Sequence, residues 1–298
     1  MSVLKKIYSK KKLSDGRIKL RLLGISLKYR PLNAPYPPVK QPKLGISYSV
    51  WDGEELLEGS IHAIKPAVDY VNVVWQRLSW HGKECNPNLE NQLLSLKEKG
   101  LIDEIIFFDC DPKIHPNVNE CTKRNLGLTA AQRAGCTHFI PLDVDEYYEL
   151  EQFKKAYQYI LEQNISHSAC VQFAYRTATV RDTNPLNFFA PFIYRIDHGE
   201  KLELDAFGGF LPWLLDPTKQ IAIKKRSRIS FLHQIYLHHF SFTRNDLEKK
   251  LQNSSANKSE NWVQEYKKSV GLIDDDIEKK LKQGIYVKVP NIFNVNID

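Results

Sequence analysis

Hydrophobic and polar positions follow two alternating rhythms between residues 44 and 165. Short apolar runs, typical of buried strands, are separated by longer segments whose apolar residues recur every three or four positions, as in amphipathic helices. Strands are expected over 43–51, 70–76, 102–109 and 137–143, and helices over 52–66, 86–100, 119–135 and 149–164. Four rounds of strand and helix predict an α/β fold, with a mostly parallel sheet flanked by helices.

After residue 165 the pattern loosens. Further strands are expected over 168–180, 188–196 and 229–242, and a glycine-bearing loop covers 204–216. From Asn245 onward the chain is charged and predicted to be helical. The main body therefore divides into 44–165, 166–244 and a helical extension, 245–298.

The N-terminal segment has its own pattern. Apolar and basic residues alternate over 18–22 and again over 25–29, which predicts a small β-hairpin. Five prolines in the fourteen residues 30–43 then predict an extended linker. A domain boundary near residue 43 follows, with 1–43 as a separate unit.

Charge separates the same two regions. Residues 1–43 hold twelve Lys or Arg against one acid, Asp15, a balance of +11; because the chain carries +7, the other 255 residues carry −4. A nucleic-acid enzyme would concentrate basic residues around its working groove, so no nucleic-acid partner is expected. A basic end suits an anionic surface such as the inner face of the plasma membrane; the alternative is a solvated, charged terminus.

Composition points to a globular, cytoplasmic protein. At 42% hydrophobic and 26% charged residues, the chain is neither disordered nor fibrous. It has no apolar run near the ~20 residues that span a bilayer, and the N-terminus lacks the apolar core of a secretory signal. Five scattered cysteines without a CxxC pair predict reduced thiols, not a disulfide framework or a zinc site.

Two aspartates, Asp143 and Asp145, follow the fourth expected strand. In parallel sheets, ligands bind at the carboxyl ends of the strands. Two carboxylates there suit a divalent cation that also binds substrate phosphates, typically Mg²⁺ or Mn²⁺. The alternative is a solvated acidic turn. Glu146 and Glu149 are expected to begin the next helix, whose N-terminus favours acidic residues.

The stretch KRNLGLTAAQRAGCTHFIPLDVDE, with Arg124-Asn125, Gly127 and Asp143-Val144-Asp145, resembles the family-two-type glycosyltransferases with the A-type (GT-A) nucleotide-sugar fold. The likeness covers residues 44–165, and Tyr194-Arg195 resembles a later strand of that family. It implies that 44–165 is the nucleotide-sugar-binding half and that 166–244 is the acceptor-binding half. Near the first strand the chain is similar to a subgroup common among bacterial surface-glycan enzymes.

The resemblance implies roles for the acidic and basic residues. Asp145 would bind the metal directly, and Asp143 would contact ribose or metal. Arg124 would contact phosphate or sugar, since cations neutralise the charge that develops on a leaving diphosphate; alternatively it forms a salt bridge with Glu120 at i−4. The acidic run that often holds the base in that family is absent after the second strand. Trp51 and Asp52 are therefore expected on the base side, with Gln76 or Arg77 as substitutes.

Later parts of the chain supply further candidates. In the resembled family a C-terminal histidine often gives the third metal ligand; here His238 or His239 would do so, with His239 slightly favoured. An inverting transfer needs a base for the acceptor hydroxyl, and the candidates are Asp205 and Asp216. Trp213 is a candidate sugar-stacking platform.

These observations predict a metal-dependent hexosyltransferase. It would move a sugar from a nucleotide-sugar donor, expected to be UDP-linked, to a glycan or lipid-linked glycan in polysaccharide or lipopolysaccharide synthesis. Two alternatives stay open: a non-catalytic nucleotide- or glycan-binding protein of the same fold, and a nucleotidyltransferase. The latter normally has a glycine-rich phosphate loop after its first strand, which this chain lacks.

Overall fold

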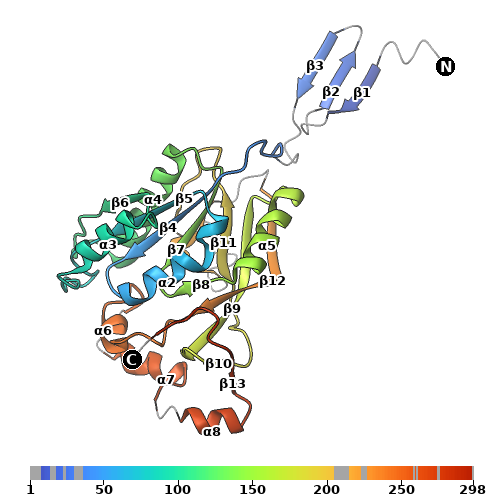
Figure 1. Ribbon diagram of the computed structural model, residues 1–298. Coiled ribbons are helices and arrows are strands. Elements are labelled where there is room, and N and C mark those ends of the chain that lie inside the picture. Colours follow the sequence, from blue (N-terminus) through green and yellow to red (C-terminus); the bar gives the residue numbers. More distant parts are fainter. Residues whose placement is uncertain are drawn as a thin grey trace.

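The computed structural model describes residues 8–13, 18–22, 25–29, 36–204, 215–222, 227–257, 259, 261–273 and 276–296. A large mixed β-sheet with helices on both faces forms the main body, and a three-stranded sheet near the N-terminus stands apart from it (Figure 1). All five cysteines are free thiols. No helix in the described ranges combines the length and apolarity that a membrane crossing requires.

The four strands expected in the first half are present and parallel. Their order across the sheet is β7 (His138–Asp143), β4 (Leu44–Val50), β5 (Tyr70–Trp75) and β6 (Glu104–Phe107). Buried residues occupy every position of β5 and six of the seven in β4, as expected for strands covered on both faces. The predicted α/β class is confirmed.

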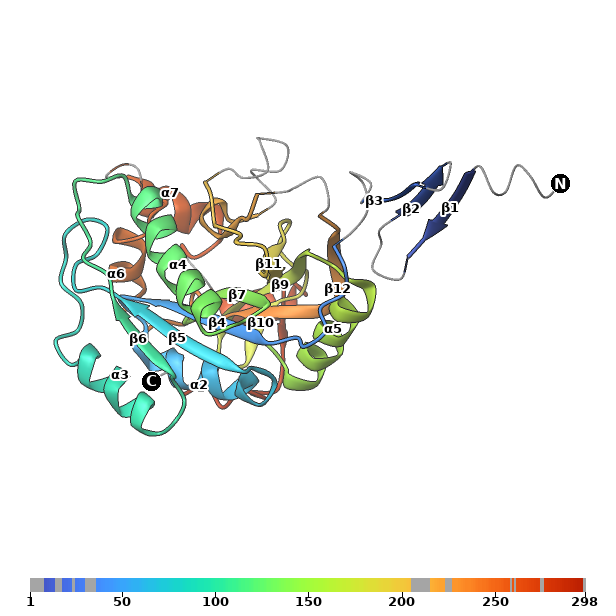
Figure 2. The same ribbon diagram turned by 90° about the horizontal axis from the view of Figure 1, so that it is seen from above.

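The four expected helices are also present. They are α2 (Glu54–Ile64), α3 (Leu89–Glu98), α4 (Pro116–Arg133) and α5 (Leu150–Gln163). Figure 2 shows α4 on one face of the sheet, and α2, α3 and α5 on the other. The main core lies between the sheet and helices α2, α3 and α5, where Leu57, Leu93 and Phe153 are fully buried. Burial of each such side chain stabilises the folded state by ~1.5–3 kcal/mol.

Gly127 sets how closely α4 approaches the sheet. A Cβ on this residue would lie 1.8 Å from Ser47 Oγ and 2.9 Å from Asn72 Oδ1. The Asn72 side chain donates to the Gly127 carbonyl at 3.0 Å, which locks the helix to β5 at that point. The glycine of the RN-x-G pattern therefore serves helix–sheet packing.

The second half extends the sheet with strands that are mostly antiparallel. They are β8 (Glu146–Tyr147), β9 (His167–Thr177), β10 (Val180–Asp182), β11 (Ala190–Arg195) and β12 (Ile229–His239). Strand β11 lies between β7 and β9, and β12 runs parallel to β9. Strand β12 also pairs with β8, and this pairing sets His239 opposite Glu146. The later part of the chain is thus brought to the end of β7.

The C-terminal extension is helical, as expected, with one addition. It contains α6 (Leu247–Gln252), α7 (Trp262–Ser269) and α8 (Ile277–Lys282), and two short 3₁₀ turns, η1 (Lys65–Ala67) and η2 (Pro217–Lys219), occur earlier. A last strand, β13 (Tyr286–Lys288), pairs with β10 at the edge of the large sheet. The extension is therefore built into the main sheet.

The N-terminal hairpin is confirmed and gains a third strand. Strand β2 (Ile18–Leu22) pairs with β3 (Ile25–Tyr29), and β1 (Tyr8–Lys12) pairs with the other edge of β2. The lysine run in β1 has little apolar alternation, which is why the pattern did not reveal this strand. Within the proline-rich segment, Tyr36 stacks on His198 with ring centroids 4.2 Å apart.

Candidate active site

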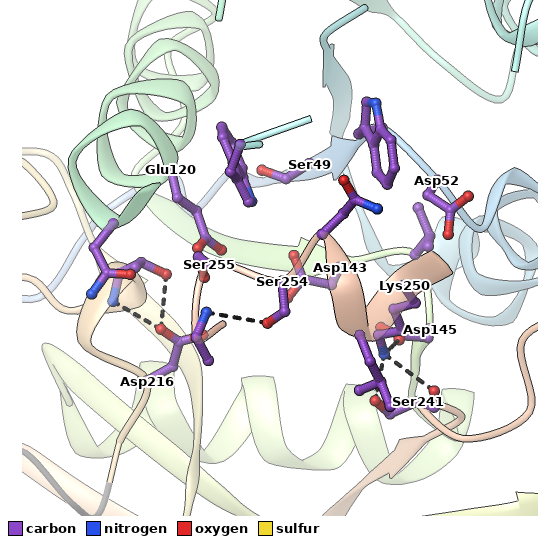
Figure 3. A pocket seen from close by; sticks show the side chains of 18 of the residues that line it. Ser49, Asp52, Glu120, Asp143, Asp145, Asp216, Ser241, Lys250, Ser254 and Ser255 are labelled. Atoms are coloured by element: carbon purple, nitrogen blue, oxygen red, sulfur yellow. Dashed lines mark hydrogen bonds and ion pairs between the residues drawn. The ribbon is translucent and has the colours of Figure 1, made fainter. Parts of the chain in front are cut away.

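A cavity of about 550 Å³ opens where β4 and β7 end, and its size is within the usual range for small-molecule sites. Residues at the ends of the two strands and just after them supply one wall, including Trp51, Asp52, Asp143 and Asp145. Figure 3 labels the three aspartates. The opposite wall comes from α6, α7 and the chain between them. The site therefore lies at the sheet edge that the sequence predicted, and the C-terminal extension covers it.

Asp143, the last residue of β7, is held by two buried cations. Arg124 Nη2 donates to its two carboxylate oxygens at 2.9 and 3.2 Å, and Lys219 Nζ lies 2.9 Å from Oδ2. Burial alone would raise the pKa of Asp143, but Arg124 and Lys219 hold it well below its usual range. Asp143 is therefore ionised at neutral pH, and its charge is balanced from within the protein.

Asp145 lies among three basic side chains, which come from the end of β12, from α6 and from the chain between these elements. Its Oδ2 accepts from Arg244 Nη2 at 2.9 Å and from Lys250 Nζ at 2.7 Å, and its Oδ1 lies 3.6 Å from His239 Nε2. Burial opposes ionisation here too, yet Lys250 and Arg244 keep the pKa of Asp145 well below the usual value. The two aspartates thus belong to separate ion-pair clusters.

Glu146 does not begin the following helix, contrary to the expectation. It lies in β8, where its carboxylate accepts from Lys219 Nζ at 2.7 and 2.8 Å and from the Asp143 backbone N–H at 2.9 Å. Helix α5 begins at Leu150, with Glu149 as its N-cap residue. Lys219 is only 2% exposed and lies between Glu146 and Asp143. The Glu146 carboxylate therefore helps to balance the charge of a buried lysine.

Arg124 forms the salt bridge with Glu120 that the sequence offered as one alternative, and its contact with phosphate or sugar stays a prediction. Besides Asp143, its Nη2 donates to Glu120 Oε1 at 2.5 Å, one helical turn earlier. Its Nε contacts Thr218 Oγ1 at 3.3 Å. The side chain of Asn125, next to it, makes two hydrogen bonds with the Leu202 backbone: Nδ2 donates to the carbonyl at 2.8 Å, and Oδ1 accepts from the N–H at 2.9 Å. The RN pair therefore joins α4 to the end of β7 and to the chain around Leu202.

The two adjacent histidines point to opposite sides of β12. His239 lines the cavity beside Asp145. His238 instead bonds Tyr175 OH through Nδ1 at 2.8 Å and is 9% exposed; burial lowers its pKa to about 4. The expectation that His238 could bind a metal in this site is therefore wrong, because strand alternation carries its ring away from the cavity.

The base side of the cavity differs in part from the expectation. Trp51 and Asp52 line it, and Lys249 contacts both, with its Nζ 2.6 Å from Asp52 Oδ1 and 5.0 Å from the Trp51 ring centroid. Gln76 does not line the cavity; it is fully buried and donates to the Leu78 carbonyl at 2.7 Å. Gln76 is therefore a structural residue. Trp80, four residues later in the same loop, lines the cavity.

Of the two candidate bases, only Asp216 can be placed. It lines the cavity and caps η2, its Oδ1 accepting from the backbone N–H and the hydroxyl of Thr218, both at 2.8 Å. Asp205 and Trp213 lie outside the described residues. Asp216 is therefore the candidate base that the geometry brings to the pocket.

Sequence reasoning missed the basic side chains that surround the carboxylates. Lys219, Arg244 and Lys250 follow no recognisable motif, although Arg244 comes five residues after the singled-out His239. Lys123 is a fourth: it is 1% exposed and donates to the Val50 carbonyl at 2.8 Å. Burial, followed by repulsion from Arg124, lowers the pKa of Lys123 to about 7. Position in the sequence gave a signal for two of them, since Lys123 directly precedes Arg124 and Arg244 follows the histidine pair; no local pattern indicates Lys219 or Lys250.

The arrangement does not fit a divalent cation. Carboxylates and an imidazole are suitable ligands, but three of the four carboxylate oxygens of Asp143 and Asp145 already contact Lys or Arg nitrogens. Unit charges 4 Å apart at a protein surface repel by roughly 4 kcal/mol, and a divalent ion would double that figure. Among the residues that the structure describes, no group of three or more His, Cys, Asp or Glu could hold a metal ion. The metal site stays a prediction of the sequence.

No protein-family model matches the chain, and neither does any curated protein. Solved structures are similar at low identity. The chain is 13% identical to S. aureus TarS, with a TM-score of 0.41, over 80% of this chain and 43% of that one. It thus spans less than half of that protein's length.

Shorter TarS structures are similar as well. For TarS 1-349 in complex with UDP, the identity is 13% and the TM-score 0.39, over 80% of this chain and 72% of that one. For TarS 1-349 in complex with UDP-GlcNAc, the identity is 15% and the TM-score 0.36, over 66% of this chain and 58% of that one. Likenesses this weak carry no argument about function, so the functional inference depends on the pocket.

Proposed function

We propose that this protein is a glycosyltransferase that moves a sugar from a UDP-linked donor to a glycan or lipid-linked glycan in cell-surface polysaccharide synthesis. One observation carries the proposal: the aromatic and acidic residues after β4, Trp51 and Asp52, share a cavity with the carboxylates after β7. An α/β sheet binds nucleotides at this edge. The sequence resemblance to GT-A glycosyltransferases supports a sugar nucleotide as the ligand.

The residues divide into two groups by position. Trp51 and Asp52 would hold the nucleoside, the ring by stacking and the carboxylate by accepting from ribose or base. The diphosphate would lie near Asp143 and Asp145, where Arg244 and Lys250 also line the cavity. Electrostatic stabilisation of a leaving diphosphate is a large contribution to catalysis in such transfers, and the buried cations here are held in fixed positions by ion pairs.

Asp216 is the proposed base in an inverting transfer. Its carboxylate lines the cavity, and the Thr218 contacts to Oδ1 fix its orientation. A base must come within hydrogen-bond reach of the acceptor hydroxyl, so the acceptor would enter between Asp216 and Phe188, which lines the same cavity.

The N-terminal sheet is proposed to bind an anionic membrane surface, which would place the enzyme at the cytoplasmic face beside a lipid-linked acceptor. Lys11 in β1 pairs with Lys19 in β2, so two lysines lie directly opposite each other. Like charges directly opposite one another destabilise a sheet. An anionic lipid surface would relieve that repulsion.

A screen of nucleotides by thermal shift tests the proposed donor, because a ligand that binds the folded state raises the melting temperature. UDP and UDP-sugars should stabilise the protein more than ADP, GDP or CDP. The Mn²⁺ or Mg²⁺ that the sequence predicts is tested in the same screen, with and without Mn²⁺. If no nucleotide shifts the melting temperature at saturating concentration in either condition, the proposal fails.

Hydrolysis of the donor separates an enzyme from a binding protein. A glycosyltransferase without its acceptor slowly transfers the sugar to water and releases UDP. UDP release above the buffer rate supports the enzyme. Stabilisation by UDP-sugars without turnover, with any acceptor glycan offered, would indicate the non-catalytic binder.

A further inference from the structure

Two cations occupy the place where the sequence predicts a metal ion. Lys250 Nζ is 2.7 Å from Asp145 Oδ2, and it also contacts the Ser241 carbonyl oxygen at 3.2 Å and the Ser241 hydroxyl. Arg244 reaches the same carboxylate oxygen with Nη2 at 2.9 Å and Nε at 3.3 Å. Figure 3 shows Lys250 at Asp145 and Ser241, beside Asp143.

The chain is built to hold Arg244 in this position. A Cβ on Gly53 would lie 1.3 Å from Arg244 Nη1, and Gly53 has a φ of +80°, so both the space and the backbone conformation there require glycine. The guanidinium therefore fills a slot between Gly53 and Asp145. The Arg244 side chain is only 6% exposed, and buried arginines are seldom left without full pairing.

One nitrogen of Arg244 has no hydrogen-bond partner among the described residues. Nη1 is buried, and it lies 3.8 Å from Asp52 Oδ2, which is beyond hydrogen-bond distance. Arg244 and Lys250 both line the cavity. An unsatisfied buried donor is costly, and a phosphate oxygen arriving in the cavity would satisfy it.

We propose that the site binds the diphosphate through Arg244 and Lys250 in place of a divalent metal, with Asp145 as the residue that positions them. This inference depends on the proposed function, since it assumes a nucleoside diphosphate in the cavity. Arg244 acts through a fixed guanidinium, whose fork of donors matches phosphate oxygens. Lys250, whose side chain is 22% exposed, is the more accessible of the two cations.

Isothermal titration of UDP into the full-length protein tests the inference. The titration is done in EDTA and again in Mn²⁺. The inference predicts a Kd that differs less than about threefold between the two conditions. UDP binding in Mn²⁺ but not in EDTA overturns the inference and leaves the proposed function standing. No UDP binding in either condition overturns the proposed function as well.

Variants locate the binding cations. Lys250→Ala should weaken UDP binding in EDTA by at least tenfold, and Lys250→Arg should restore most of it. Lys154→Ala is the matched control, since Lys154 pairs with Glu151 at the surface of α5. If Lys250→Ala binds UDP as tightly as Lys154→Ala does, the inference is wrong. Circular dichroism confirms that each variant is folded, and the EDTA comparison on the unaltered protein needs no variant.

Discussion

Lys250 Nζ lies 2.7 Å from Asp145 Oδ2 although the two residues are 105 positions apart in the sequence. The contact joins α6 to the turn after β7 and closes the cavity from the C-terminal side. A carboxylate in the motif that the sequence assigns to a metal is thus a partner for basic side chains. This relationship determines how the site is expected to respond to substitution.

Asp145→Ala should lower donor hydrolysis by about a hundredfold. Without the carboxylate, Arg244 and Lys250 repel each other and leave their positions, and displacement of binding groups by about 1 Å can cost ~10²-fold in rate. The rate of UDP release from a UDP-sugar measures this. Glu151→Gln, at an exposed position of α5, is the control and should keep the full rate. Equal rates for Asp145→Ala and the control would contradict the role given to Asp145.

Arg124→Ala should lower the free energy of unfolding by ~3–5 kcal/mol, the usual cost of removing one partner from a buried ion pair. Asp143 and Glu120 both lose a buried partner in this variant. Arg133→Ala on the same helix is the matched control, because the Arg133 side chain is 66% exposed and pairs with Glu104 at the surface. Exposed pairs contribute ~0–1 kcal/mol. Chemical denaturation that gives similar losses for both variants would show that Arg124 is not part of a buried network.

His238 should make the protein less stable in mild acid. Its pKa of about 4 in the folded state lies below the ordinary 6.5, so the unfolded chain binds more protons between these values. The free energy of unfolding therefore falls as the pH drops from 6.5 to 4, by at most ~1.4 kcal/mol per pH unit from this residue. Denaturation of His238→Gln across this range should show a shallower loss; an unchanged slope would mean that His238 is not buried as a neutral ring.

Removal of residues 1–43 should reduce binding to vesicles that contain anionic lipid, because it takes away twelve basic residues. Vesicle sedimentation at low and high salt measures the effect, and the binding of the full chain should weaken as salt screens the charges. Donor hydrolysis should be unchanged, which shows that the body is still folded. Vesicle binding that survives the deletion would rule out the N-terminal sheet as the membrane-binding part.

The first half of the fold could be predicted because its strands are rich in apolar residues and most of its helices are amphipathic. Helix α5 and strand β7 follow from such patterns alone. Strand β13 could not be predicted in this way, since its three residues pair at a sheet edge and the surrounding tail is charged. Strand β1 is mainly lysine, and its pairing with β2 gives no signal in the hydrophobic pattern.

The site was predictable where a residue ends a strand or directly follows it. Asp143, Trp51 and Asp52 lie in the cavity because strand direction fixes where they go. Residues such as Lys250 reach it through chain folding over a hundred positions, which no local pattern encodes. Position after a strand is not sufficient on its own. Gln76 also follows a strand, but its side chain donates to the Leu78 carbonyl within its own loop and does not reach the cavity.

A crystal structure of the protein with a UDP-sugar tests the central claim most directly. We expect the uracil beside Trp51 and Asp52, and the diphosphate within hydrogen-bond distance of Arg244 and Lys250. UDP bound outside this cavity would contradict the proposed site. UDP bound within it through a metal ion held by Asp143 and Asp145 would keep the glycosyltransferase and contradict the role of the two cations.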